Sequence, residues 1–304
     1  MQNLIETFLS IKAPGSGRTY RQALEQWGEF IGDRWSKAKP SDAIKLYGYL
    51  KRQPGERGRR AADATVNKKW HAVSSFYGYL VAMGETKANP FLVASKTFSK
   101  RQATQVRPTV LIPFKVVSQF FEAPDLGTKI GVRDRCIIKL LFAGALRRSE
   151  AAGLSLSDIS VTQKGALYVT LRQSKAGKRQ TRRLAPWAWD SINDLVIQRR
   201  EEGASENSPL LTWYHKGIKS SEVNLTGNAI YKIFVSYAKS IGLHATPHSA
   251  RATAASRLAE MGYRDWEIAE ILGHASPHMA RVYDKRSRSV DESVIANLDF
   301  TEVA

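Results

Sequence analysis

The sequence has few of the features that mark secreted, disulfide-bonded or membrane-spanning proteins. It contains a single cysteine, Cys136, which excludes an internal disulfide framework. No apolar run approaches the ~20 residues that a membrane-spanning helix needs, and the N-terminal segment lacks the pattern of a signal peptide. We therefore expect a soluble, intracellular protein with no membrane partner.

Metal-binding patterns are also scarce. The six histidines are scattered, and no cluster of cysteine and histidine has the spacing of a zinc site. His244 and His248 are four residues apart, but Pro247 between them disfavours a shared helical face. Cys136 lies in the apolar run CIIKLLFAGAL, which predicts a buried core thiol rather than a nucleophile. We expect neither a metal nor another cofactor.

Acidic residues are outnumbered by basic ones. The chain has 28 Asp and Glu against 46 Lys and Arg, which gives a formal net charge of +18. This balance indicates a polyanionic partner, nucleic acid before an anionic membrane. Hydrophobic residues make up 43% of the 304 residues, enough for a packed core in one large or two medium domains.

Residues 1–92 predict a small helical domain with a basic surface. Apolar and aromatic residues recur at helical spacing in three segments, 19–33, 41–53 and 63–84, and are most simply core. A single charge run is usually only a solvated face, but the N-terminal third holds most of the excess positive charge, which favours contact with the DNA backbone. The residues expected to make this contact are Lys51, Arg52, Arg57, Arg59, Arg60, Lys68 and Lys69.

The rest of the chain is divided by changes in composition. Residues 93–112 lack clear periodicity and are rich in Lys, Arg, Ser and Thr, which predicts an extended basic linker. A second domain is expected over 113–288. The tail 289–304 is weakly amphipathic and too short to hold a core of its own.

The second domain is expected to be mainly helical with a small antiparallel β-sheet. A bend is expected near Gly144, and Lys175 falls at the tip of the second of two hairpins. A polar loop, EEGASENSPL, separates the next two helices. The expected elements are helices at 113–124 and 133–154, strands at 158–162, 166–174 and 179–186, and helices at 187–202 and 226–241.

The segment 244–286 carries the most informative motif. His248 and Arg251 are three residues apart, which places them on one helix face. Thr246 and Pro247 suit the N-cap and the first position of that helix. Two cationic donors in a first turn, where the helix dipole already favours an anion, indicate a site for phosphate chemistry.

Further candidates follow this pair or precede it. His274 comes directly after the helix break at Gly273, and Tyr283 lies nine residues further on. Taken singly, Arg147, Lys175 and Tyr283 each have an ordinary explanation, as a surface ion pair, a solvated lysine and a core or surface ring. The ordered set of Arg, Lys, His-x-x-Arg, Gly-His and Tyr is more informative than any member.

The order and local context of these residues resemble the tyrosine recombinase (phage integrase) family. AGALRRSEAAGLSLSDI resembles the first arginine box of the family, and SKAGKRQTRRLAP resembles its lysine-bearing hairpin. TPHSARATAASRLAEMG is similar to its His-x-x-Arg box, and ILGHASPHMARVYDK is similar to the box with the second histidine and the nucleophilic tyrosine. The resemblance covers about 108–290 with specific motifs and the N-terminal helices more loosely.

The resemblance implies a SAM-like core-binding domain (1–92) and a tyrosine-recombinase catalytic domain (113–288). The implied catalytic residues are Arg147, Lys175, His248, Arg251, His274 and Tyr283. The two arginines would stabilise charge on a DNA phosphate, the tyrosine would attack it, and the lysine would protonate the leaving 5′-oxygen. The first histidine would help deprotonate the tyrosine, and the second would donate a hydrogen bond to the phosphate. Glu150 would buttress Arg147 rather than act on substrate.

The sequence departs from the family pattern in two places. AGALRR stands where the family usually has a Thr-Gly-Leu-Arg run, so the glycine is shifted by one place and Arg148 competes with Arg147 for the role of first arginine. His278 lies close enough to His274 to be an alternative second histidine, although the Leu-Gly-His context favours His274.

The implied function is site-specific DNA recombination through a 3′-phosphotyrosyl intermediate and a Holliday junction, without metal or ATP. The implied partners are a double-stranded recombination site and further copies of the chain. These would form a homo-tetramer in the synaptic complex, with a monomer or dimer on a single site, in a cytoplasmic, nucleoid-associated setting. The tail 289–304 would dock on a neighbouring protomer or fold back on its own domain. The alternatives are a type IB topoisomerase, a non-catalytic DNA-binding protein on the same scaffold, and a histidine-metal nuclease.

Overall fold

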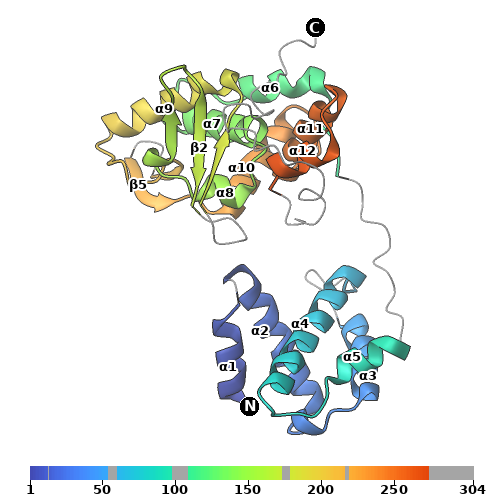
Figure 1. The fold of residues 1–304 in the computed structure, drawn as a ribbon. Helices are drawn as coiled ribbons and strands as arrows, with labels where there is room; N and C mark the ends of the chain where they lie inside the picture. Colours follow the sequence, from blue (N-terminus) through green and yellow to red (C-terminus); the bar gives the residue numbers. More distant parts are fainter. Residues whose placement is uncertain (13, 54–59, 98–108, 173–178, 216–218, 274–304) are drawn as a thin grey trace. The chain divides into compact units, whose positions relative to one another are not determined.

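The computed structural model describes residues 1–273, apart from residue 13 and the segments 54–59, 98–108, 173–178 and 216–218. The chain divides into two compact units, Met1–Pro108 and Thr109–Ala304 (Figure 1). Within the described residues the fold is mainly α-helical, and both small antiparallel sheets belong to the second unit. This confirms the fold class that the sequence predicts.

The first unit packs five helices around an aromatic core. Its elements are α1 (Gln2–Ser10), α2 (Pro14–Ile31), a 3₁₀ turn (Trp35–Lys37), α3 (Pro40–Arg52), α4 (Asp63–Ala82) and α5 (Pro90–Thr97). The Tyr77 hydroxyl accepts a hydrogen bond from Trp27 Nε1 at 3.1 Å and donates to Trp35 O at 2.8 Å. The Phe91 ring meets Trp70 edge to face, with 4.9 Å between centroids. The aromatic stripes of the sequence are therefore the core of this unit.

The segment between the units is more ordered at both ends than the sequence suggests. The linker is expected to be extended from residue 93, but α5 continues to Thr97, because Phe91 and Ala94 are fully buried against the aromatic core. At the other end, Ile112 is buried in the second unit and its N–H donates to Thr253 Oγ1 at 2.8 Å. Residues 98–108 lie outside the described part of the chain.

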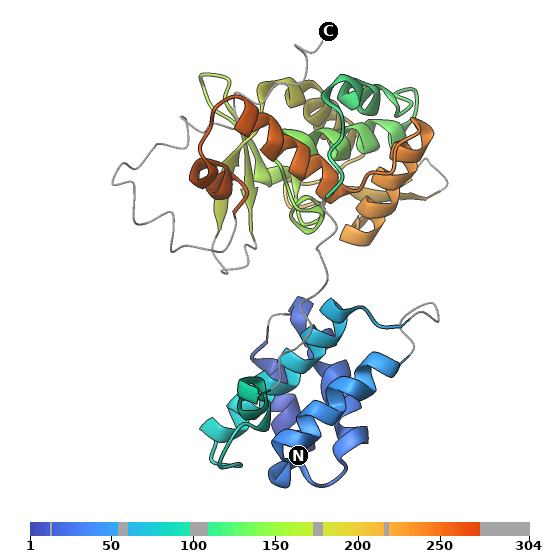
Figure 2. The same ribbon diagram turned by 90° about the vertical axis from the view of Figure 1, so that its right-hand side faces the viewer.

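The second unit is built around α7, whose side chains are buried along most of its length. Its helices and strands are α6 (Val117–Glu122), α7 (Lys129–Ala143), α8 (Arg148–Ala152), β1 (Ile159–Val161), β2 (Leu167–Leu171), β3 (Gln180–Arg183), α9 (Trp189–Glu201), β4 (Thr212–His215), β5 (Lys219–Asn224), α10 (Gly227–Ser240), α11 (Pro247–Glu260) and α12 (Asp265–Ile271). Three 3₁₀ turns lie at Phe114–Val116, Leu156–Asp158 and Pro186–Ala188. Helices α9 and α11 pack against α7, and α11 crosses the face turned to the viewer in Figure 2.

The three-stranded sheet joins the end of α7. The strands run antiparallel in the order β1-β2-β3, as the hairpin pattern predicts, with Val169 opposite Arg182. Beyond β3, the Ala185 N–H donates to Ala143 O at 3.2 Å, which ties the strand to the last turn of α7. Side chains of β3 and those at the C-terminal end of α7 can therefore contribute to the same site.

The second sheet, β4–β5, is absent from the sequence-based expectation, which has a polar loop between two helices here. Its second strand reads KSSEVN and has no hydrophobic alternation to reveal it. Long-range polar contacts hold the hairpin instead. Arg133 Nη1 donates to Thr212 O at 3.0 Å, and Gln198 Nε2 donates to the Tyr214 hydroxyl at 2.6 Å. None of the described helices combines the length and apolar character needed to cross a membrane.

Candidate active site

The turn between α7 and α8 places the first arginine. The bend expected near Gly144 is a full break, since α7 ends at Ala143 and α8 begins at Arg148. Ala145 is buried and has a φ of 46°, a left-handed conformation that costs a non-glycine residue roughly 1–2 kcal/mol. A glycine at this position would adopt the conformation freely. The shifted glycine of AGALRR thus leaves an alanine at the strained position of the turn.

Arg147 is the N-cap residue of α8 and is held on two sides. Its backbone N–H donates to Glu150 Oε2 at 2.7 Å, and its Nη1 donates to Glu150 Oε1 at 2.6 Å. Its Nη2 donates to Gly273 O at 2.7 Å. The Glu150 side chain is 7% exposed and that of Arg147 is 30% exposed. A buried carboxylate therefore orients a guanidinium that solvent, or a ligand, can still reach.

Helix α11 supplies the second arginine. It begins as predicted, with Thr246 as N-cap and Pro247 in the first turn. Arg251 is 3% exposed and donates from Nη1 to Ala145 O and from Nη2 to Leu272 O. Burial, with the nearby charge of Arg147 as a second cause, lowers the pKa of Arg251 to about 10. Because burial disfavours the charged form of Arg251, a neighbouring anion would stabilise that form.

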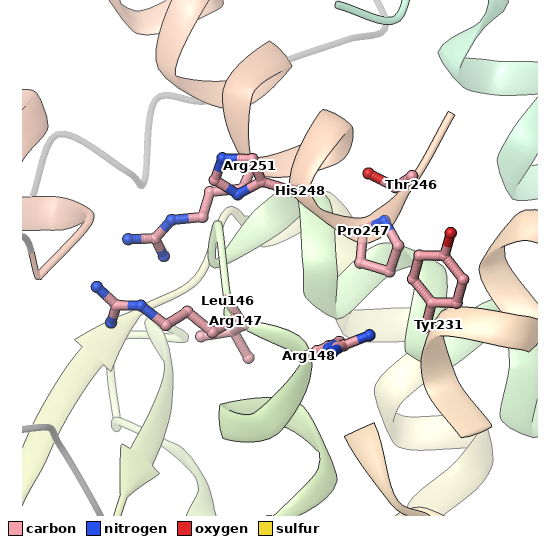
Figure 3. A pocket seen from close by; sticks show the side chains of 8 residues that line it. All are labelled: Leu146, Arg147, Arg148, Tyr231, Thr246, Pro247, His248 and Arg251. Carbon is pink, nitrogen blue, oxygen red and sulfur yellow. The ribbon is translucent and has the colours of Figure 1, made fainter. Parts of the chain in front are cut away.

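The arginines and His248 line one pocket. Its volume is about 240 Å³, and it is lined by Leu146, Arg147, Arg148, Tyr231, Thr246, Pro247, His248 and Arg251 (Figure 3). His248 is exposed in the first turn of α11, one turn before Arg251. Figure 3 shows the guanidinium groups of Arg147 and Arg251 extending to the same side. Forked donors from two elements, beside an imidazole, suit the non-bridging oxygens of a phosphodiester.

Arg148 does not replace Arg147. Its guanidinium points away from the other two in Figure 3 and lies 5.4 Å from the centroid of the Tyr231 ring. Arg148 is exposed, whereas Arg147 is joined to Glu150 and Gly273. Among the described residues, the Arg147–Glu150 pair and Arg251 are the predicted site residues that the fold brings together with His248.

Several predicted site residues lie outside the described part of the chain. They are Lys175, His274, Tyr283, Arg57 and Arg59, together with His278 and the tail 289–304. The described chain ends at Gly273, the residue before His274 in the sequence, and the carbonyl of Gly273 accepts from Arg147.

The described residues that are predicted to contact DNA through the first unit lie at the end of α3 and on or just before α4. Lys51 forms an ion pair with Asp63, which links the end of α3 to the start of α4. Arg52, Arg60 and Lys68 are exposed, and burial lowers the pKa of Lys69.

One charged residue at the site is not predicted from the sequence. Arg182, in β3, is buried and its Nη1 lies 3.5 Å from Glu150 Oε2. Arginines near a hairpin tip are usually solvated, so composition gave no sign of it. The signal was the alternation in β3 and after it, where Arg182 and Leu184 are both buried and Thr181 is exposed.

Comparisons with known proteins identify the family of the chain. The model of the phage integrase family matches residues 111–289. The tyrosine recombinase XerD of Lacticaseibacillus casei is 27% identical over 272 residues, which cover 87% of this chain and 85% of that protein. The tyrosine recombinase XerC of Herpetosiphon aurantiacus is 26% identical over 296 residues, which cover 93% of this chain and 90% of that protein.

Solved structures share the fold. XerH site-specific recombinase, in a post-cleavage complex with a palindromic difH substrate, has a TM-score of 0.66 at 20% identity, over 88% of this chain and 75% of that chain. A lambda integrase dimer bound to a COC′ core site has a TM-score of 0.61 at 15% identity, over 95% of this chain and 99% of that chain. Because the family model spans more than half of the sequence, this protein belongs to the phage integrase family of tyrosine recombinases.

Proposed function

We propose that the protein is a site-specific DNA recombinase that cleaves and rejoins duplex DNA through a covalent phosphotyrosyl intermediate. The observation that carries the proposal is the convergence of Arg147, Arg251 and His248 on one pocket from two separate helices. A phosphodiester is anionic and repels nucleophiles, so its cleavage needs concentrated positive charge at the phosphorus. The net charge of +18 supports a nucleic-acid substrate.

The proposed reaction exchanges one phosphoester for another. The Tyr283 oxygen forms a bond to phosphorus and the bond from phosphorus to the 5′-oxygen breaks, which leaves a 3′-phosphotyrosine and a free 5′-hydroxyl. His248 accepts the tyrosine proton, and Lys175 donates a proton to the departing oxygen. Rejoining is the reverse attack, by a 5′-hydroxyl on the phosphotyrosine. Because the phosphotyrosine conserves the phosphoester bond, no ATP is consumed.

The arginines act on the phosphate during both steps. Arg147 and Arg251 offer N–H donors to the non-bridging oxygens as charge builds on them in the transition state. Their positions are set before DNA arrives, because each is bound to backbone carbonyls or to Glu150. His274 follows the carbonyl that Arg147 binds, and we propose that it donates a hydrogen bond to the same phosphate.

Assembly extends the proposal beyond one chain. We propose that the first unit binds the DNA backbone through its basic residues, and that four copies join two DNA sites and exchange strands in pairs through a Holliday junction. XerH bound to difH and the lambda integrase dimer on a core site have the same fold, which supports a DNA site as partner. The tail 289–304 is proposed to dock on a neighbouring copy.

The decisive experiment traps the covalent intermediate. A bound site is selected from fragments of the source genome and prepared with a nick beside the scissile phosphate, so that cleavage becomes irreversible. A covalent protein–DNA band on denaturing gels is expected with wild type in EDTA and not with Tyr283→Phe. Tight binding without a band from wild type contradicts the catalytic proposal. A band together with relaxation of plasmids that lack the site would instead favour a topoisomerase.

A further inference from the structure

Strand β3 carries a third arginine behind the two that line the pocket. Arg182 is 4% exposed, and its Nη1 donates to Gly144 O at 3.2 Å. The same atom lies 3.5 Å from Glu150 Oε2, and Nη2 donates to Gln180 Oε1 at 3.4 Å. A side chain buried to this degree does not reach DNA, so any role in the reaction acts through its neighbours.

We propose that Arg182 is a positioning residue for DNA cleavage, which holds Glu150 and Gly273 so that Arg147 meets the phosphate in one orientation. The inference rests on the proposed function and names a residue beyond the six in its catalytic set.

Glu150 is held between two arginines. One of its oxygens accepts from Arg147 Nη1, and the other accepts from the Arg147 backbone and faces Arg182. A buried carboxylate with a single cationic partner has more freedom to turn than one held between two. Arg182 therefore limits the orientations open to Glu150, and through it those open to the Arg147 guanidinium.

Gly273 is a second neighbour that the two arginines share. A Cβ atom built on this residue would lie 3.3 Å from Arg182 Nη2 and 3.7 Å from Arg147 Nη1. The two guanidinium groups therefore flank the same backbone residue, and Arg147 also binds its carbonyl. Displacing Arg182 would loosen the packing around that carbonyl, at the point from which the chain continues to His274.

Charge also links these side chains. Two guanidinium groups pair with one carboxylate, and the charge of Arg251 is coupled to all three groups, so positive charge is in excess beside the pocket. Burial lowers the pKa of Arg182, and the Arg147 charge lowers it further, while Glu150 opposes the change. Charges in a poorly solvated region act over longer distances than surface charges. Glu150 thus offsets the repulsion between these like charges, so its orientation bears directly on where the Arg147 guanidinium lies.

The experiment compares five variants of the full-length protein on the nicked substrate, of which Glu150→Gln and the Glu150→Gln/Arg182→Gln double variant test the link through Glu150. Arg182→Gln removes both the charge and the planar, forked N–H donors of the guanidinium. Arg182→Lys keeps the charge and removes the forked donors. Arg183→Gln is the matched control, since it removes a charge from the next position of the same strand. The rate of covalent complex formation at saturating DNA, the Kd for DNA and the Tm are measured for each.

We expect Arg182→Gln to slow covalent complex formation by about 10- to 100-fold, the order of loss that misplaced reacting groups produce. The Kd should change by less than about threefold, because Arg182 does not touch DNA. Arg182→Lys should recover part of the rate, and Arg183→Gln should stay within about twofold of wild type. The Glu150→Gln/Arg182→Gln double variant should be little slower than Glu150→Gln alone, because both act through Arg147.

Other results overturn the inference. If Arg182→Gln lowers only the Tm and forms covalent complex at the wild-type rate, the arginine serves stability alone. If the double variant loses the product of the two single effects, Arg182 does not act through Glu150. If Arg182→Gln does not fold, Arg182→Lys provides the test instead. A wild-type rate of covalent complex formation in Arg182→Lys would show that the forked donors of Arg182 have no positioning role. Failure of wild type to form any covalent band contradicts the proposed function instead.

Discussion

Arg147 Nη2 donates to Gly273 O at 2.7 Å, which joins the N-cap residue of α8 to the second residue beyond α12. Arg251 makes the parallel connection, from α11 to Ala145 O and to Leu272 O. Backbone carbonyls of Ala145 and of residues 272–273 thus hold the two guanidinium groups.

The first prediction separates Arg147 from its neighbour. Arg147→Gln should lower the rate of covalent complex formation by about 10²–10³-fold, the usual cost of removing one preorganised donor to a developing oxyanion. Arg148→Gln removes the same charge one residue later, from a side chain that lies over Tyr231, and should retain most of the rate. Single-turnover cleavage of the nicked substrate measures both. Equal losses would mean that the two arginines share the role.

The second prediction concerns Gly273. Its φ of +56° costs an alanine about 1–2 kcal/mol, and the added Cβ would crowd Arg182 and Arg147. Gly262→Ala carries a similar backbone penalty at φ +86°, with nothing within 4 Å of the added Cβ. Both variants should lower the Tm by a similar amount in thermal unfolding, and only Gly273→Ala should also slow cleavage. A normal rate for Gly273→Ala would show that this carbonyl tolerates displacement.

The third prediction concerns the turn before Arg147. Gly144→Ala places a Cβ 2.5 Å from Leu184 Cδ2 and 3.0 Å from Leu146 Cγ, and should cost about 1–3 kcal/mol as overpacking. Ala145→Gly relieves the strain of the left-handed conformation, but it removes a buried methyl group and raises the conformational entropy of the unfolded chain. Because these effects oppose each other, the stability of Ala145→Gly should stay within about 1 kcal/mol of wild type. Urea denaturation measures both. The reverse order of stabilities would contradict the geometry of this turn.

The fourth prediction concerns DNA binding by the first unit. Arg52, Arg60 and Lys68 are exposed, whereas Lys51 is engaged by Asp63. Each phosphate contact contributes about 0.9 to the slope of log K against log salt concentration, so the triple alanine variant should lower the slope by roughly 2.7. Lys87→Ala, an exposed lysine outside this group, is the control and should leave the slope unchanged. Equal slopes for wild type and the triple variant would remove these residues from the interface.

Sequence patterns predict a helix or strand well where short-range interactions determine it. Thr246 and Pro247 start α11 because a cap and a preset φ act within one turn, and this was readable from the sequence. The β4–β5 hairpin was not readable, since Arg133 and Gln198, far away in the chain, hold it. Helix α5 was obscured because its burial depends on the aromatic rings of other helices.

The site shows the same division. His248 and Arg251 are neighbours on one helix turn, so their spacing placed them together. Arg147 was linked to them only through the resemblance to a family, because no local rule brings α8 beside α11. Arg182 was missed for a physical reason: its burial is favoured by Glu150 and the Gly144 carbonyl, and neither partner can be identified from the strand itself.

The carbonyl contacts of the two arginines also bear on the order of events during protein synthesis. Arg147 and Gly273 are 126 positions apart and Arg251 and Leu272 are 21 positions apart, so both acceptors are made after the arginines that bind them. A nascent chain that has not yet passed these residues holds its arginines without those partners, and it also lacks Tyr283. If Tyr283 is the nucleophile, as proposed, the capacity to break a DNA strand arises only after residues 109–282 of the second unit have been synthesised.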